Sequence, residues 1–151
     1  MSFKILVPID LEEESSWRKP LAVAFELAQK LNGTVTVMTV VPDLKALLDW
    51  RYAIRGETGG SAGFDMRTIV EDAEKRLRQI VQEEAPAGME VTTIARHGSI
   101  YEEILDLAAE IEADQIVMAA HRPTMTEYLL GEVTSRIVRH AKCSVNVVRG
   151  D

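Results

Sequence analysis

The regular alternation of strand-like and helix-like patterns is the feature that most constrains the fold of this chain. Short apolar or β-branched runs alternate with longer stretches in which apolar residues recur at helical spacing. The strand-like runs are Phe3 to Ile9, Thr34 to Val41, Met89 to Arg96, Asp114 to Ala120 and Ser144 to Arg149. Five strands and four main helices in this order predict an α/β fold, with a parallel sheet, right-handed crossovers and helices on both faces.

Helix boundaries are indicated by capping residues. Ser15 or Ser16 is expected to cap the first helix, and Asn32-Gly33 to end it. The longest helix is predicted over Met66 to Glu84, where three acid-first pairs at i,i+4 spacing mark a solvated face. Ser99 and Glu102 have the spacing of a capping box before the apolar stripe of IYEEILDLAAEI.

Length and composition limit the domain number and the partners. The 151 residues, of which 46% are hydrophobic, suit one domain over residues 1–151 with a full core. The net charge of -7, without a basic run, argues against a nucleic-acid partner. Cys143 has no second cysteine to pair with, and neither a signal-peptide pattern nor an apolar run of about 20 residues is evident. We therefore expect a cytoplasmic protein with no membrane contact.

The segment from Asp43 to Asp65 has a weaker pattern. A short helix is predicted around Leu44 to Ile54, followed by the turn-rich sequence RGETGGSAG. Its glycines suggest a phosphate cradle, but no Gly-Lys-Ser/Thr follows and no strand precedes them. The sequence favours a surface loop without assigned chemistry.

The last third of the chain carries the best functional signal. The strand DQIVMAA is followed by the loop HRPTMTEYLL, and Gly131 then opens the helix EVTSRIVRHAKC. A helix therefore starts just beyond the carboxyl end of a buried strand, where α/β sheets bind phosphate-bearing ligands.

Taken in order, five segments resemble the universal stress protein family over nearly the whole chain. They are ILVPID, HGSIYEEILDLAAEI, the strand ending in Met118, YLLG with VTSRIVRHA, and CSVNVVR. The His-Arg-Pro at 121 to 123 is similar to that of one subgroup. The resemblance implies a Rossmann-like (adenine nucleotide alpha hydrolase-like) sheet of order 3-2-1-4-5. It also implies a homodimer through the last strand, Ser144 to Arg149.

The resemblance further implies a nucleotide site where the strand order reverses, between strands one and four. Adenine and ribose would lie against the first loop and the end of strand two, and the phosphates against the loop after strand four and the following helix start. Carried onto this chain, the binding residues are Pro8, Ile9, Asp10, Val40, Val41, Met118, Ala119, His121, Arg122, Gly131, Glu132, Val133 and Thr134. ATP or AMP, with or without Mg²⁺, would be the ligand.

Several of these residues have a second interpretation. Asp10 could accept hydrogen bonds from ribose or adenine, or stabilise its own loop. Gly131 could admit a phosphate, supply a positive φ before the helix, or do both. His121 could contact an anion or hydrogen-bond within the loop, and Arg122 could bind phosphate or remain an exposed loop arginine.

The chain departs from the family's Gly-x2-Gly-x9-Gly-(Ser/Thr) pattern. Ala119 replaces the first glycine, and the spacing from Arg122 to Gly131 is one residue shorter. Glu132 stands where the phosphate-binding hydroxyl would be, and a carboxylate about 4 Å from a phosphate would repel it by about 1 to 4 kcal/mol. Arg122 is the expected compensator, by bridging Glu132 or by taking phosphate oxygens.

Other kinds of site find little support. His140 and Cys143 offer two ligands, whereas a zinc site needs three or four. Neither a nucleophile motif nor a paired-carboxylate signature is present, so we expect no enzyme, although slow ATP hydrolysis or phosphotransfer stays open. A two-component receiver domain would need clustered acids after strand one and a phosphoacceptor aspartate at the end of strand three, whereas strand one gives a single aspartate, Asp10, and strand three ends in Arg96-His97.

Two functional classes follow. The first is a dimeric, adenine-nucleotide-binding stress-response regulator, in which ligand occupancy changes the loop from 119 to 131 with little or no turnover. The second is a nucleotide-free dimeric adaptor that acts on an unidentified regulatory protein by contact alone, with Glu132 occupying the helix start.

Overall fold

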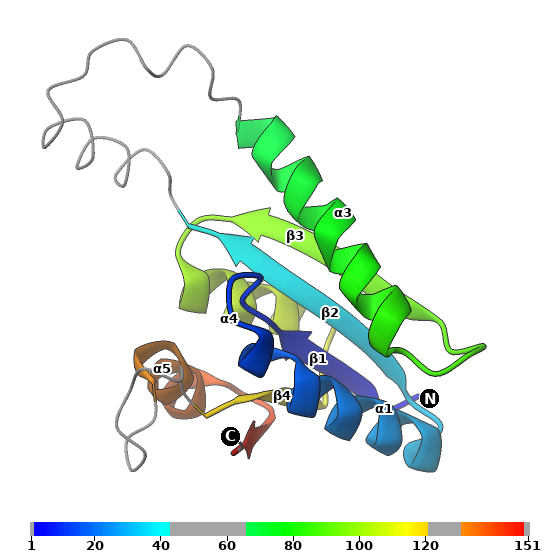
Figure 1. The fold of residues 1–151 in the computed structure, drawn as a ribbon. Helices are drawn as coiled ribbons and strands as arrows, with labels where there is room; N and C mark the ends of the chain where they lie inside the picture. The colour runs from blue at the N-terminus through cyan, green and yellow to red at the C-terminus, as the bar shows by residue number, and fades with distance from the viewer. Residues whose placement is uncertain (1, 43–65, 121–130, 150–151) are drawn as a thin grey trace, which may run out of the picture.

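The computed structural model describes residues 2–42, 66–120 and 131–149, which build a five-stranded parallel sheet (Figure 1). The order of its strands is β3-β2-β1-β4-β5, which confirms both the α/β class and the predicted order. The strands are β1 (Lys4–Pro8), β2 (Thr34–Val41), β3 (Val91–His97), β4 (Gln115–Ala119) and β5 (Ser144–Val148). Because every pair of neighbours is parallel, all five carboxyl ends lie at one edge of the sheet.

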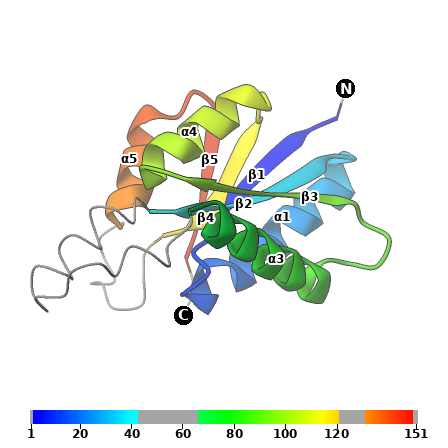
Figure 2. The same ribbon diagram turned by 90° about the horizontal axis from the view of Figure 1, so that it is seen from above.

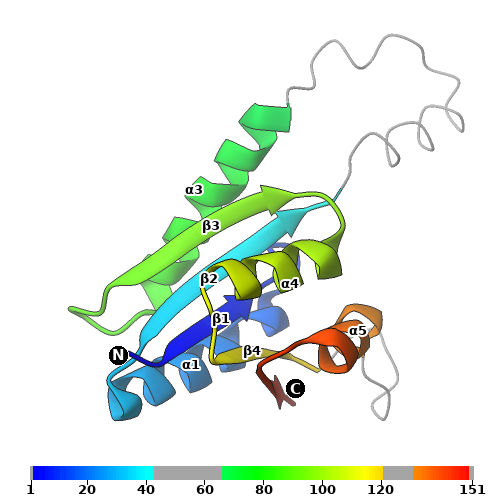
Figure 3. The same ribbon diagram turned by 180° about the vertical axis from the view of Figure 1, so that it is seen from behind.

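Helices cover both faces of the sheet. The helices α1 (Arg18–Leu31) and α3 (Met66–Glu84) lie on one face, and α4 (Ile100–Glu110) and α5 (Glu132–His140) lie on the other (Figures 2 and 3). Each face has its own apolar core, since alternate strand residues point to opposite sides. Fully buried members of the first core include Val7, Leu21, Val37 and Leu77, and those of the second include Leu6, Met38, Ile116 and Ile137.

The predicted bounds of β2 and α3 agree with the structure residue for residue. The start of β3 was predicted two residues early, because Met89 instead belongs to the turn after α3, where its N–H donates to the Pro86 carbonyl at 3.2 Å. The predicted short helix at residues 44–54, the glycine-rich segment that follows it and the His-Arg-Pro loop lie outside the described residues.

The prediction that Ser15 or Ser16 caps α1 is wrong. Both serines lie in a short 3-10 helix, η1 (Glu14–Ser16), and Trp17 is the N-cap residue. Trp17 cannot cap through an oxygen, but its indole is buried in the first core. The hydroxyl of Ser16 instead bonds the backbone of Asp10, so tertiary contacts override the local capping preference.

The predicted end of α1 is confirmed. Asn32 has a left-handed conformation (φ 54°), and the Gly33 N–H donates to the Ala28 carbonyl at 2.8 Å. Gly33 is needed for close approach, because a Cβ there would lie 2.4 Å from the Phe3 carbonyl oxygen. That carbonyl accepts the Thr34 N–H at 2.8 Å, so the helix end and the β1 entry are joined.

Two further local predictions need correction. Ser99 is the N-cap of α4, as predicted, but its side chain makes no capping bond, so the capping box with Glu102 does not form. Gly131, the N-cap of α5, has φ -59°, which any residue adopts, so the positive-φ interpretation of this glycine is wrong. Close approach of its backbone to a ligand is the interpretation that remains.

Candidate functional site

The reversal of strand order falls between β1 and β4, as predicted. Pairing between these two strands consists of Ile5↔Gln115 and Leu6↔Ile116, and it ends there although both strands continue. On its other side β1 pairs with β2 along its full length, up to Pro8↔Met38. The carboxyl ends of β1 and β4 are therefore not joined by a ladder, at the position where open α/β sheets bind ligands.

We call residues 8–16 and 39–41 the β1 side of this reversal. Pro8 and Ile9 are buried, and Ile9 is tied to β2 at both backbone groups: its N–H donates to the Met38 carbonyl at 2.8 Å, and its carbonyl accepts from Thr39 Oγ1 at 3.0 Å. Thr39 is buried, and sequence reasoning did not single it out. The half-buried Val40 and Val41 complete β2 beside it.

Asp10 continues the β1 side and is held by a two-way contact. The Asp10 N–H donates to Ser16 Oγ at 2.8 Å, and Ser16 Oγ donates to the Asp10 carbonyl at 2.9 Å. Asp10 Oδ1 also accepts the Glu12 N–H at 3.0 Å, which is an Asx turn. The loop-stabilising role of Asp10 is thus observed, and its role in ligand binding stays a prediction.

We call residues 118–120 and 131–136 the β4 side. The Gly131 N–H donates to the Ala120 carbonyl at 2.9 Å, so the two ends of the intervening loop meet. Thr134, which is buried, donates from Oγ1 to the Ala119 carbonyl at 2.9 Å and fixes the first turn of α5 to the end of β4. The predicted residues Met118, Ala119, Gly131, Val133 and Thr134 are therefore brought together.

The start of α5 receives no side-chain cap from Gly131. Glu132 is mostly exposed (78% of its side chain), and its Oε1 pairs with Arg136 at 3.1 Å. The Arg136 guanidinium lies 4.8 Å from the centroid of the Tyr101 ring on α4. Neither Arg136 nor Tyr101 was among the predicted site residues, although the acid-first i,i+4 spacing of Glu132 and Arg136 could have indicated their ion pair. The predicted partners His121 and Arg122 lie outside the described residues.

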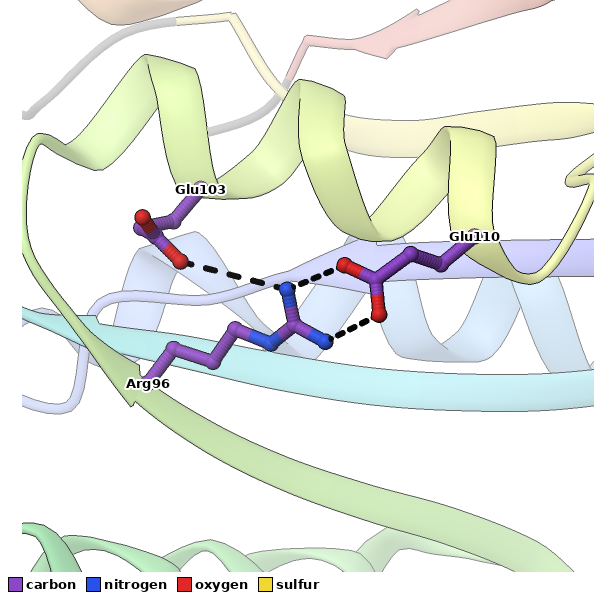
Figure 4. Close-up of polar contacts among 3 residues, drawn as sticks. All are labelled: Arg96, Glu103 and Glu110. Carbon is purple, nitrogen blue, oxygen red and sulfur yellow. Dashed lines mark hydrogen bonds and ion pairs between the residues drawn. The ribbon is translucent and has the colours of Figure 1, made fainter.

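An arginine clamp joins β3 to α4: Figure 4 shows Arg96 of β3 reaching Glu103 and Glu110 of α4. Arg96 forks onto both carboxylate oxygens of Glu110, at 2.6 and 2.8 Å, and lies 3.9 Å from Glu103. Hydrogen bonding to Glu110 raises the pKa of Arg96, and the same bond lowers the pKa of Glu110. The following Gly98 N–H donates to the Val41 carbonyl at 3.0 Å, so the β3–α4 connection borders the β1 side.

Other features lie away from the reversal. Within residues 2–42, 66–120 and 131–149, no group of three His, Cys, Asp or Glu side chains could hold a metal ion, and no helix could span a membrane. Cys143 is a half-buried free thiol whose pKa is raised by desolvation. A groove of about 380 Å³ between the end of α3 and the start of β3 is lined mainly by aliphatic side chains and contains none of the predicted residues.

Comparison with known proteins identifies the family. The profile of the universal stress protein family matches residues 1–149. The chain belongs to the universal stress protein family. Universal stress protein G of Escherichia coli O157:H7 is 30% identical over 149 residues, which cover 96% of this chain and 97% of that protein. The family resemblance drawn from the sequence is thereby confirmed.

Solved structures of universal stress proteins have the same fold. UspA from Lactobacillus plantarum matches with a TM-score of 0.67 at 24% identity, covering 97% of each chain. A universal stress protein solved in complex with cAMP matches with a TM-score of 0.61 at 20% identity, covering 99% of this chain and 98% of that one. At these identities the likeness concerns the fold.

Proposed function

We propose that this universal stress protein binds an adenine nucleotide, ATP or AMP, at the reversal between β1 and β4, and acts as a dimeric switch with little or no turnover. The observation that carries the proposal is the early end of β1–β4 pairing beside the start of α5, whose N-cap residue, Gly131, has no side chain to cap it. The cAMP complex of a structurally similar family member supports the choice of an adenine nucleotide.

The local geometry suits such a ligand. The half-buried Val40 and Val41 supply apolar surface on the β1 side, above the buried Ile9, where a base and ribose would lie beside Asp10. The first turn of α5 directs backbone N–H groups and the positive end of the helix dipole toward the β4 side, where phosphates would lie. Thr134 is not a phosphate ligand by its hydroxyl here, since that hydroxyl donates to Ala119.

The dimer half of the proposal rests on β5, which is an edge strand of five residues. The Val148 carbonyl accepts the Ala120 N–H at 3.1 Å, so Val148 directs its backbone groups toward β4. Val147, one residue earlier, directs its own toward the open edge, because these directions alternate along a strand. An edge of this kind pairs with a second copy of the same strand.

Light scattering with a strand variant tests the dimer. Val147→Pro removes an outward N–H and should convert the dimer to a monomer, since proline is tolerated on an edge only where no partner needs the donor. Val147→Ala keeps the N–H and serves as the matched control. A monomeric mass for the unmodified protein at micromolar concentration would refute the dimer.

The nucleotide half is tested by isothermal titration of ligand-stripped protein with ATP, ADP and AMP, with and without Mg²⁺. We expect a micromolar Kd, about -8 kcal/mol, for at least one of them. No heat and no thermal shift at millimolar nucleotide would overturn the nucleotide-binding proposal and leave the dimeric adaptor. If only Glu132→Ser binds, the Glu132 carboxylate is what blocks the site, and the protein is an adaptor with a latent nucleotide fold.

A further inference from the structure

Arg136 has two partners that together fix where its charge lies. It pairs with Glu132 one turn earlier on α5, at 3.1 Å, and its guanidinium lies over the Tyr101 ring of α4, at 4.8 Å. Helical side chains lean toward the N-terminus of their helix, so the guanidinium is carried toward the first turn of α5. Its positive charge therefore lies beside the carboxylate that occupies that turn.

The contact with Tyr101 makes this pair different from other exposed pairs of the same spacing. Lys30 and Glu26 on α1 lie 2.9 Å apart with both side chains about two-thirds exposed, and among the residues that the structure describes no cation–π contact is found for Lys30. An exposed pair of that kind is readily exchanged for water. Arg136 is held by a ring on the neighbouring helix, and cation–π contacts favour arginine in a fixed plane.

We propose that Arg136 is a positioning residue for nucleotide binding. Held on Tyr101, it draws the Glu132 carboxylate away from the first N–H groups of α5 and offsets its charge, so that the helix start accepts a phosphorylated ligand despite the acidic residue. This inference rests on the proposed function and deepens it, because it makes affinity depend on the charge of the phosphate chain. In the absence of Arg136, Glu132 repels each added phosphate charge.

A double-mutant cycle tests the inference. The unmodified protein, Arg136→Ala, Glu132→Gln and the double variant are titrated with ATP, AMP and adenosine. Arg136→Ala should weaken ATP binding about five- to tenfold, AMP binding less and adenosine binding not at all. The reason is that the unpaired Glu132 carboxylate repels a ligand in proportion to its phosphate charge, which adenosine lacks. In the Glu132→Gln background the same change should cost less than about twofold, because no carboxylate is left to neutralise.

Matched variants separate this role from a structural one. Arg139→Ala removes the same charge from an exposed residue of the same helix and should leave ATP affinity within about twofold. Tyr101→Leu keeps an apolar contact but removes the ring, and should reproduce part of the Arg136→Ala loss. Equal losses for ATP and adenosine, or equal losses in both Glu132 backgrounds, would show that Arg136 only packs α4 against α5, and would overturn the inference.

The possible failures can be told apart. If the unmodified protein binds ATP and Arg136→Ala binds it equally well, the positioning role fails and the proposed function stands. If only Glu132→Gln binds ATP, the unmodified protein binds none, so the proposed function and the inference both fail, and the Glu132 carboxylate is identified as the group that blocks the site. If neither the unmodified protein nor Glu132→Gln binds any nucleotide, the proposed function fails, and the inference fails with it.

Discussion

The two sides of the strand-order reversal are anchored by the same kind of hydrogen bond, but they differ in how their acidic residue is held. On each side a buried threonine donates to the carbonyl of a residue at a strand end: Thr39 to Ile9 on the β1 side, and Thr134 to Ala119 on the β4 side. Beyond that anchor, Asp10 is enclosed by backbone and hydroxyl contacts, whereas Glu132 is held by an exposed ion pair. The β1 side thus has a fixed shape, and the β4 side depends on charge.

The largest expected effects concern the two anchors. Thr39→Val leaves the buried Ile9 carbonyl without this donor, and Thr134→Val does the same to the half-buried Ala119 carbonyl, while both keep the side-chain volume. Each should lower the free energy of unfolding by about 1 to 3 kcal/mol. Urea denaturation measures both. Thr92→Val, on an exposed position of β3, is the control and should change the value by no more than about 0.5 kcal/mol. A loss at Thr134 no larger than that of the control would show that the two sides are not anchored alike.

A smaller effect is expected for the contact that encloses Asp10. Ser16→Ala removes both hydrogen bonds to the Asp10 backbone, and should cost about 0.5 to 1.5 kcal/mol of unfolding free energy. Ser15→Ala is a matched control, because Ser15 is the exposed neighbour in the same 3-10 helix. If the nucleotide proposal holds, Ser16→Ala should also weaken adenosine binding, because it disturbs the fixed side. Unchanged adenosine affinity beside a measurable loss of stability would place Asp10 outside the binding surface.

The smallest expected effect is the loss of stability at acid pH from the Arg96–Glu110 clamp, which joins β3 to α4. Glu110 has a lowered pKa in the folded protein because Arg96 donates to its carboxylate. Its contribution to stability is therefore full above the ordinary glutamate pKa of about 4.3, and is lost as pH falls through the lowered value. Glu110→Gln should flatten the fall of Tm in this acidic window and lower Tm slightly at pH 7. Glu71→Gln, an exposed carboxylate of α3, is the control, and an equal flattening there would remove the clamp as the cause.

Prediction of the fold from sequence succeeded where pattern and burial agree. β2 and α3 match their predicted ranges, because a run of β-branched residues and a long apolar stripe each indicate one structure. Prediction of the first cap failed at Ser16, and at Ser99 the N-cap position was correct but the capping bond does not form. Capping propensity is local and worth about 1 kcal/mol, so at Ser16 the hydrogen bonds to the Asp10 backbone displace it.

For the candidate site, the sequence placed the residues but not their partners. The alternation of patterns together with the family resemblance determined the parallel sheet, its order and the strand ends that meet at the reversal. Only the tertiary structure decided that Ser16 braces Asp10, that Thr39 and Thr134 anchor the two sides, and that Arg136 lies between Glu132 and Tyr101. The physical reason is that periodicity reports which face of an element is buried, whereas a hydrogen bond or ring contact between elements depends on how those faces are packed in three dimensions.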